Sequence, residues 1–249
     1  RPRLPDPLGG RPIDSFPASI NRLADGLRTP YQMHAAIGVE QRLPHDAVLT
    51  VTYNYVRGLH LFRSRDVNAP QPGTFTRPNP EFGRIAELES SSTATYHGLS
   101  IGFSQSIGER VSLFGNYSLS RAIDDADGPT AFPADGYNLI GERGFAARDE
   151  RHQAFAGALL VLPYRLEVSP MIYFNTGRPY NITTGFDDNG DSVPNDRPTG
   201  LRRNSGRGPN FASVDLRLAR SFRFGRGGGQ TDVAPFGIEI AAEASNLFN

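Results

Sequence analysis

The sequence contains no cysteine, no lysine and no tryptophan among its 249 residues. The lack of cysteine excludes disulfide bonds, thiolate catalysis and zinc-thiolate sites, and it is compatible with a protein of the cell envelope. Every basic residue is an arginine and the formal net charge is zero. We therefore expect no nucleic-acid partner, since no basic cluster is interleaved with aromatic residues. Arginine also suits bidentate pairing with carboxylates inside a polar lumen.

A long hydrophobic run is missing as well. A membrane-spanning helix needs roughly 18 to 20 apolar residues, and the longest candidate, residues 154–163, is about half that length. A transmembrane β-strand needs only about 9 to 11 residues, of which alternate ones face lipid. A hydrophobic content of 38% and a mean hydropathy of −0.41 are thus compatible with a β-barrel. No signal peptide is evident and the chain opens inside a loop-like segment, so we expect a fragment or an excised domain.

A repeating unit dominates what is present: an alternating apolar and polar strand, a short turn, a second such strand and a long polar loop. Two clear copies cover residues 99–119 and 155–174, with turns at 107–110 and 163–165. Short turns at one end and long loops at the other, joined by strands of period two, are typical of transmembrane β-barrels. The repeat predicts a membrane passage rather than a catalytic pocket.

The whole chain, residues 1–249, is predicted to be one unit: an all-β, antiparallel, up-and-down segment of a transmembrane β-barrel with about eight long strands. Prolines in residues 1–30 forbid a long regular element there and predict a loop. A glycine-rich flexible turn is expected at residues 225–229, inside the last hairpin. The predicted hairpin regions are 31–59, 84–121, 151–176 and 211–248.

Charged residues occur on the polar face in the middle of several predicted strands. We expect them to face a wet lumen, because a lipid-facing charge at mid-depth costs about 2 to 4 kcal/mol. In the last hairpin, Arg217 is expected near one of the glutamates of the facing strand. The alternative is the solvated outer face of a soluble sandwich, although the strand lengths and the asymmetry of loops and turns favour the barrel. The predicted lumen-facing charges are Glu40, Arg42, Glu167, Asp215, Arg217, Glu239 and Glu243.

Eight loop and strand-end segments are more distinctive than the strand repeat: YNYVRGLHL at 53–61, ESSSTATY at 89–96, SLSRAIDD at 118–125, ARDERH at 147–152, TGRPY at 176–180, DNGD at 188–191, NDRP at 195–198 and NLFN at 246–249. Together these segments resemble the C-terminal part of the barrel of TonB-dependent outer-membrane receptors. The likeness is greatest to the Oar-like branch, whose members carry a carboxypeptidase-regulatory-like domain at the N-terminus. It spans nearly the whole chain, and the combination is specific although each piece alone is weak.

The resemblance implies a place in the outer membrane of a Gram-negative bacterium and a role in binding and energised uptake of a substrate. Short turns then face the periplasm, long loops face outward, and the complete barrel has about 22 strands. The plug, the TonB-interacting segment and the final strand are expected to lie outside this chain. Its implied partners are outer-membrane lipid, the TonB system through the missing N-terminal regions, and an unidentified ligand. The alternative function is that of a small structural or adhesive outer-membrane barrel, which requires the first and last strands to pair.

One loop has the pattern of a cation site. Asp187, Asn189 and Asp191 stand at the first, third and fifth positions of an EF-hand-like Ca²⁺ loop, and Asn195 and Asp196 add oxygen donors. The pattern departs at the sixth and twelfth positions, where Ser192 and Pro198 replace glycine and glutamate. A polar, turn-forming loop is therefore an open alternative. The absence of a binding heat at millimolar Ca²⁺ would exclude the metal.

Patterns typical of enzymes are scarce. The histidines form no HExxH pair, no G-x-S-x-G elbow is present, and residues 225–229 lack the Lys-Ser/Thr of a phosphate loop. A Ser-His-Asp site assembled across strands is left open by the sequence. We expect no enzyme and no cofactor other than the possible Ca²⁺.

Overall fold

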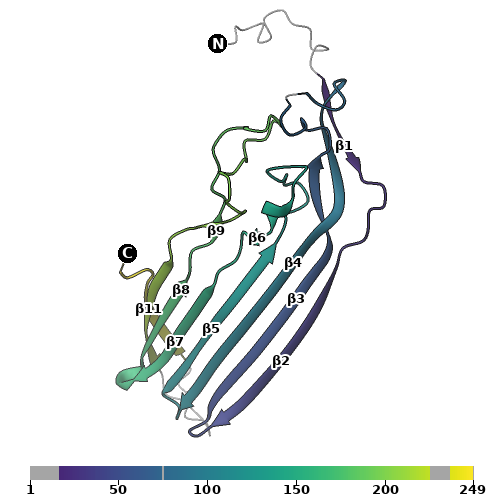
Figure 1. Cartoon of the computed structure of the whole chain (residues 1–249). Coiled ribbons are helices and arrows are strands. Elements are labelled where there is room, and N and C mark those ends of the chain that lie inside the picture. Colours follow the sequence, from purple (N-terminus) through teal and green to yellow (C-terminus); the bar gives the residue numbers. More distant parts are fainter. Residues whose placement is uncertain (1–16, 75, 225–235, 249) are drawn as a thin grey trace, which may run out of the picture.

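The computed structural model describes residues 17–74, 76–224 and 236–248, which form one curved antiparallel sheet with long strands running from short turns to long loops (Figure 1). The order along the sheet is β12-β11-β8-β7-β5-β4-β3-β2, so each long strand pairs with the long strands before and after it in the sequence. This is the predicted up-and-down meander. The long strands are β2 (Tyr31–Leu43), β3 (Ala47–Asp66), β4 (Phe82–Ile107), β5 (Val111–Asp124), β7 (His152–Leu162), β8 (Leu166–Asn175), β11 (Phe211–Phe224) and β12 (Phe236–Ala244).

The connections differ in length at the two ends of the sheet, as the repeat predicted. Turns at residues 44–46 and 108–110 and the 3₁₀ segment η3 (Pro163–Arg165) close hairpins at one end. His45 and Asp46 adopt left-handed backbone angles, with φ of 63° and 58°. The glycine-rich turn expected at 225–229 lies outside the described residues. No helix in the described ranges is long and apolar enough to span a membrane.

The predicted proline-rich loop contains a strand that the sequence did not reveal. β1 (Ala18–Leu23) pairs in parallel with the long-loop end of β4. A strand of six residues can form here because the segment between Pro17 and Pro30 contains no proline, which would remove a backbone hydrogen-bond donor from the strand pairing. The prediction of a loop over residues 1–30 was wrong for this part.

The hairpin of β3 and β4 also extends further than expected. Residue 59 was the predicted end of β3, yet pairing continues to Asp66 and Ala86 after irregularities between Gly58 and Arg63. His60 has φ of 55° at this point. A β-bulge interrupts the two-residue alternation, and the interruption resembled a strand end in the sequence.

Small elements occupy the long-loop end. β6 (Gly144–Phe145) pairs with β5, and β9 (Pro179–Tyr180) pairs with β10 (Gly206–Arg207) as a separate ladder. A 3₁₀ turn, η2 (Ile140–Glu142), precedes β6. β6 adds a two-residue strand to the main sheet beside β5, whereas the other elements shape the loops.

The two faces of the sheet differ in chemistry. Paired residues on one face form rows such as Val39, Val51, Ile101, Tyr117 and Ala154, whereas the next row on the other face is Gly38, Thr52, Ser100, Ser118 and Gln153. We call these the apolar face and the polar face. Side chains of the apolar face are largely uncovered, for example Ile37 at 70% and Ile240 at 64% exposure. Such a face suits contact with lipid.

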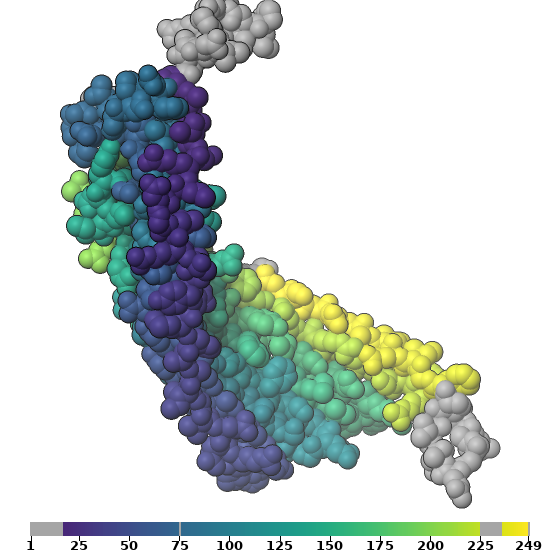
Figure 2. All heavy atoms as spheres, turned by 90° about the vertical axis from the view of Figure 1, so that its right-hand side faces the viewer, coloured from purple at the N-terminus to yellow at the C-terminus, as the bar shows by residue number. Residues whose placement is uncertain are grey.

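The sheet is open. β2 pairs only with β3 and β12 pairs only with β11 among the described residues. Figure 2 shows a curved wall whose first and last long strands, purple and yellow, follow different margins. A closed barrel of eight strands would need these two strands to pair, so the structure is an arc of a barrel wall.

Candidate functional site

The pairing register brings the predicted lumen charges onto the polar face. Glu40 lies in a row with Thr50, Gly102 and Asn116, and Asp215 lies opposite Met171 on the same face as Ser213. The expected cross-strand ion pair of Arg217 is confirmed, and it involves two carboxylates rather than one. Arg217 Nη2 is 2.6 Å from Glu239 Oε1, and its Nε is 3.0 Å from Glu243 Oε1.

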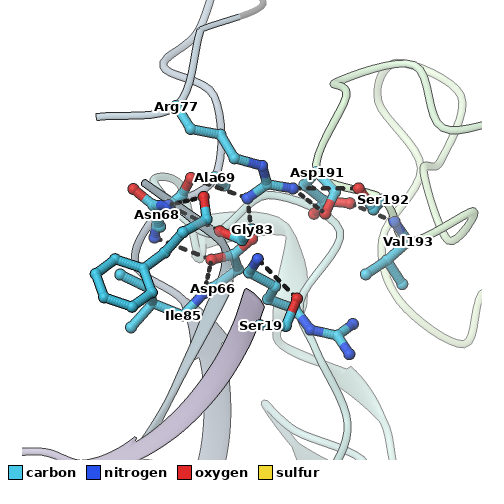
Figure 3. Close-up of polar contacts among 12 residues, drawn as sticks. Ser19, Asp66, Asn68, Ala69, Arg77, Gly83, Ile85, Asp191, Ser192 and Val193 are labelled. Carbon is cyan, nitrogen blue, oxygen red and sulfur yellow. Dashed lines mark hydrogen bonds and ion pairs between the residues drawn. The ribbon is translucent and has the colours of Figure 1, made fainter. Parts of the chain in front are cut away.

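Three long loops meet at the opposite end from the short turns. They are the first loop (residues 67–81), the second loop (residues 125–151) and the third loop (residues 176–210). Arg77 of the first loop joins the upper end of β3 to the third loop (Figure 3). Its guanidinium donates to Asp66 Oδ2 at 2.8 Å, and on its other side to the carbonyl of Asp191 and to Ser192 Oγ, each at 3.1 Å.

Asn68 closes the base of the first loop. Its side-chain amide donates to the carbonyls of Asn79, Phe82 and Gly83, and its Oδ1 accepts from the Asn79 amide at 2.8 Å. Asn68 is 2% exposed, so the amide replaces water as the partner of these backbone groups. The side chain of Asn68 therefore fixes the base of the first loop.

A buried arginine links the second and third loops. Arg203 is 3% exposed and forms ion pairs with Asp124 and Asp127, while its Nε donates to the carbonyl of Glu142 at 2.8 Å. Burial, together with the charge of Arg63, lowers the pKa of Arg203 to about 10. The guanidinium remains charged at neutral pH. Burial also raises the pKa of Asp127.

Three further ion pairs, of Arg197, Arg207 and Arg63, belong to this network. Arg197 pairs with the buried Glu142, and Arg207 pairs with the buried Asp149. Asp125 accepts from Arg63 at 2.7 Å and from the amide of Thr93 at 2.8 Å. Breaking buried, paired charges is costly, and Arg77 ties the first loop to the third, so the three loops form a fixed cap.

Two glycines permit close backbone contacts of the third loop, one with the second loop and one within the third loop itself. A Cβ at Gly144 would overlap the carbonyl oxygen of Arg203, and a Cβ at Gly177 would overlap the carbonyl oxygen of Gly208. Only glycine allows backbone to pack this closely. Gly177 lies in the TGRPY segment that resembles the receptor family, and Gly144 lies between two predicted hairpin regions.

The residues of the predicted cation loop lie within the third loop, where their oxygens bind backbone amides. Asp187 accepts from the amides of Asp191 and Ser192, Asp191 from Val193, and Asp196 from Asp188 at 2.7 Å. Asn189 and Asn195 instead donate to carbonyls of the second loop. Among the described residues, no group of three or more acidic, histidine or cysteine residues is arranged for a metal. Calcium binding at this loop stays a prediction.

Burial makes the side chain of Asp191 a weaker acid than an ordinary aspartate. Desolvation, together with the charges of Asp187 and Asp196, raises the pKa of Asp191 to about 6. Burial raises the pKa of Asp196 in the same direction. Ionisation of these two carboxylates of the third loop is therefore unfavourable. Protonation or a nearby cation would remove this cost.

A cavity of about 360 Å³ lies where the three loops meet, lined by residues that include Pro70, Thr74, Asp135, Tyr137 and Asp188. Tyr137 fixes one wall, since its hydroxyl donates to the carbonyl of Ala69 at 2.8 Å. The sequence did not reveal this cavity or the network, because each contact joins residues far apart in the chain. The one available signal was the concentration of arginine and aspartate in the loops.

A meander of long strands with one apolar and one polar face, short turns at one end and a loop cap at the other defines an outer-membrane β-barrel protein. Residues 3–201 match the family described as outer membrane beta barrel domain, and the chain belongs to this family. Its location is the bacterial outer membrane. No curated protein matches the sequence.

Two solved structures share the fold. The outer membrane transporter YddB from Escherichia coli is similar over 93% of this chain with a TM-score of 0.61 and 12% identity, and the match covers 30% of that chain. The FrpB iron transporter from Neisseria meningitidis (F3-3 variant) is similar over 81% with a TM-score of 0.51 and 14% identity, and the match covers 26% of that chain. The chain thus spans less than a third of the length of these transporters.

Proposed function

We propose that the chain forms part of the barrel wall and the ligand-capturing loops of a TonB-dependent outer-membrane receptor of the Oar-like branch. The observation that carries the proposal is the open arc of consecutive strands, which matches transporters over 93% of this chain but only 30% of theirs. An arc needs further strands to close it, because unpaired edges are not tolerated in lipid. A transporter-sized barrel supplies them.

The loop cap supports a role in substrate capture. A fixed cap holds the cavity between the three loops open before a ligand arrives, and preorganisation reduces the entropic cost of binding. The substrate then passes along the polar face of the wall, past residues such as Arg217 and Glu239. The energy comes from an inner-membrane partner acting on a plug outside this chain.

The test compares cells of the source organism that produce the full-length protein with cells lacking it. Both are grown in isotope-labelled medium, with and without a protonophore, and their accumulated solutes are compared by mass spectrometry. We expect at least one solute to require both the protein and the proton gradient. Replacing Asp135 and Asp188 together by asparagine, in the cavity wall, is expected to weaken its uptake at low concentration.

Two outcomes would contradict the proposal. Uptake that needs the protein but not the gradient indicates a passive channel. An unchanged solute profile with altered adhesion or envelope integrity supports the small structural or adhesive barrel instead.

A further inference from the structure

A groove runs along the apolar face just above the membrane-facing rows. It consists of two adjoining hollows of about 610 and 510 Å³, which share Arg121 and Phe145. His97, Arg121 and Phe145 belong to rows of the apolar face, because His97 pairs with Arg121 and Ile123 pairs with Phe145. The groove therefore opens toward the side of the wall that meets lipid.

The groove is lined by arginines and by no carboxylate among the described residues. Arg203 and Arg207 are neutralised by the aspartates of the loop network. The other lining arginines have no carboxylate partner within 4.0 Å in the described ranges, and all are exposed; they are Arg121, Arg143, Arg151 and Arg202. The guanidinium groups of Arg121 and Arg207 lie 5.8 and 4.6 Å from the ring of Phe145. The groove therefore combines an excess of positive charge with an aromatic side chain in its wall.

The depth of the groove matches that of lipid head groups. On β5 the apolar face runs from Val111 to Leu119, about 27 Å along the strand and about 21 Å in height at the usual tilt, which is close to the apolar band of about 25 Å in outer-membrane barrels. Arg121 is the next residue of this face beyond Leu119. It stands where the hydrocarbon ends.

Two tyrosine and histidine pairs mark the same level. The hydroxyl of Tyr53 shares a hydrogen bond of 2.8 Å with His97 Nδ1, and that of Tyr117 shares one of 2.7 Å with His152 Nδ1. Both pairs lie on the apolar face: His97 is in the row of Arg121, Tyr53 and His152 are in the row below it, and Tyr117 is one row further down. Amphipathic aromatic residues are typical of the membrane interface.

We propose that this groove binds the phosphorylated head group of an outer-leaflet lipid, whose acyl chains lie along the apolar face below it. Arginine is suited to the ligand because its planar fork binds phosphate through two hydrogen bonds. A soluble phosphate would gain the same contacts but none with the apolar rows.

The experiment uses the full-length protein in phosphatidylcholine nanodiscs doped with bisphosphorylated lipid A, and measures the lipid A retained on the protein by native mass spectrometry. The combined variant Arg121→Gln, Arg143→Gln and Arg202→Gln is expected to retain about a hundredfold less, because each arginine near an anionic lipid surface contributes about a factor of five. The single changes Arg143→Gln and Arg202→Gln, at exposed positions, are each expected to lose about fivefold.

The matched control is Arg220→Gln. Arg220 is also an exposed arginine of the apolar face, but it pairs with Leu166 and Ile240 near the short-turn end. It is expected to retain as much lipid A as the unchanged protein. Dephosphorylated lipid A is expected not to be retained, and millimolar inorganic phosphate not to displace the bound lipid.

Retention unchanged in the combined and single variants would overturn the proposal. An equal loss of lipid A in Arg220→Gln would mean that the lipid is held by the overall positive charge of the protein and not by the groove. Displacement by inorganic phosphate would mean that the groove binds a free anion and not a lipid. These outcomes are independent of the transport test, since lipid retention requires neither a substrate nor a proton gradient.

Discussion

Arg203 is the side chain on which the contact between the second and third loops most depends. Replacing it by alanine leaves the carboxylates of Asp124 and Asp127 without their buried counter-charge. Breaking such a buried pair costs about 3 to 5 kcal/mol, and the low end is expected because both aspartates keep some contact with water. Hydrogen exchange of the full-length Arg203→Ala protein should show faster opening of residues 124–127 and 140–145.

The adjacent residue provides the control for this change. Arg202 is exposed and has no carboxylate partner among the described residues. Arg202→Ala is expected to change loop stability by less than about 0.5 kcal/mol. Equal exchange rates in the two variants would mean that Arg203 does not hold the loops together.

Asp191 makes the third loop sensitive to pH. Its pKa is raised, by burial first and then by Asp187 and Asp196, from 3.8 to about 6. The folded loop thus binds the proton more tightly than the unfolded loop, so the stabilisation is complete below pH 3.8 and is lost as the pH rises through about 6. Protection of the loop amides, corrected for intrinsic exchange, should increase as the pH falls from about 7 to about 5.

Asp191→Asn preserves the shape of the side chain and removes its titration. Most of this pH dependence should disappear in the variant, with the remainder due to Asp196, whose pKa burial also raises. A slope identical to that of the unchanged protein would show that another group titrates.

At the scale of elements, Gly144 determines how closely the third loop approaches β6. Gly144→Ala would bring a Cβ into the carbonyl of Arg203, so the loop must shift and the pairing of Ile123 with Phe145 weakens. Overpacking of this kind costs about 1 to 3 kcal/mol. Limited proteolysis should cleave the third loop of this variant faster.

Gly141→Ala is the matched control, because Gly141 lies in the second loop as Gly144 does. Its Cβ would meet only Arg197 Nη2, at an ordinary 3.5 Å. Cleavage at the unchanged rate is expected there. If both alanine variants are cleaved alike, the close contact at Gly144 does not position the loop.

The sequence predicted the sheet and its elements well because strand patterns are local. Alternation such as that of Leu99, Ile101 and Phe103 depends only on which face each residue occupies. It failed where the alternation breaks, as at the bulge beside His60, and where a short strand lies between prolines, as in β1. The loop network could not be predicted, because Arg77 and Ser192 are 115 residues apart and nothing local selects one partner among many carboxylates.

At the scale of the whole molecule, the assignment of the apolar face to lipid predicts an asymmetry between neighbouring residues. Ile101 and Ser100 are adjacent on β4 and lie on opposite faces of the sheet. Ile101→Arg is expected to destabilise the protein in the membrane by about 2 to 4 kcal/mol, whereas Ser100→Arg enters a wet lumen and costs much less. Urea titrations of the full-length protein in lipid vesicles measure both. An equal cost for the two would contradict the assignment.

The open sheet predicts how residues 1–249 behave when separated from the rest of a barrel. β2 and β12 each present an edge with no partner in the described structure. An unpaired backbone amide or carbonyl in hydrocarbon costs several kcal/mol, so the sum along two edges exceeds the marginal stability of a domain. The isolated chain in planar bilayers should therefore give no discrete single-channel conductance as a monomer, and should aggregate through its edges. Regular unitary current steps would mean that β2 and β12 close on each other, and the chain would then be a complete small barrel.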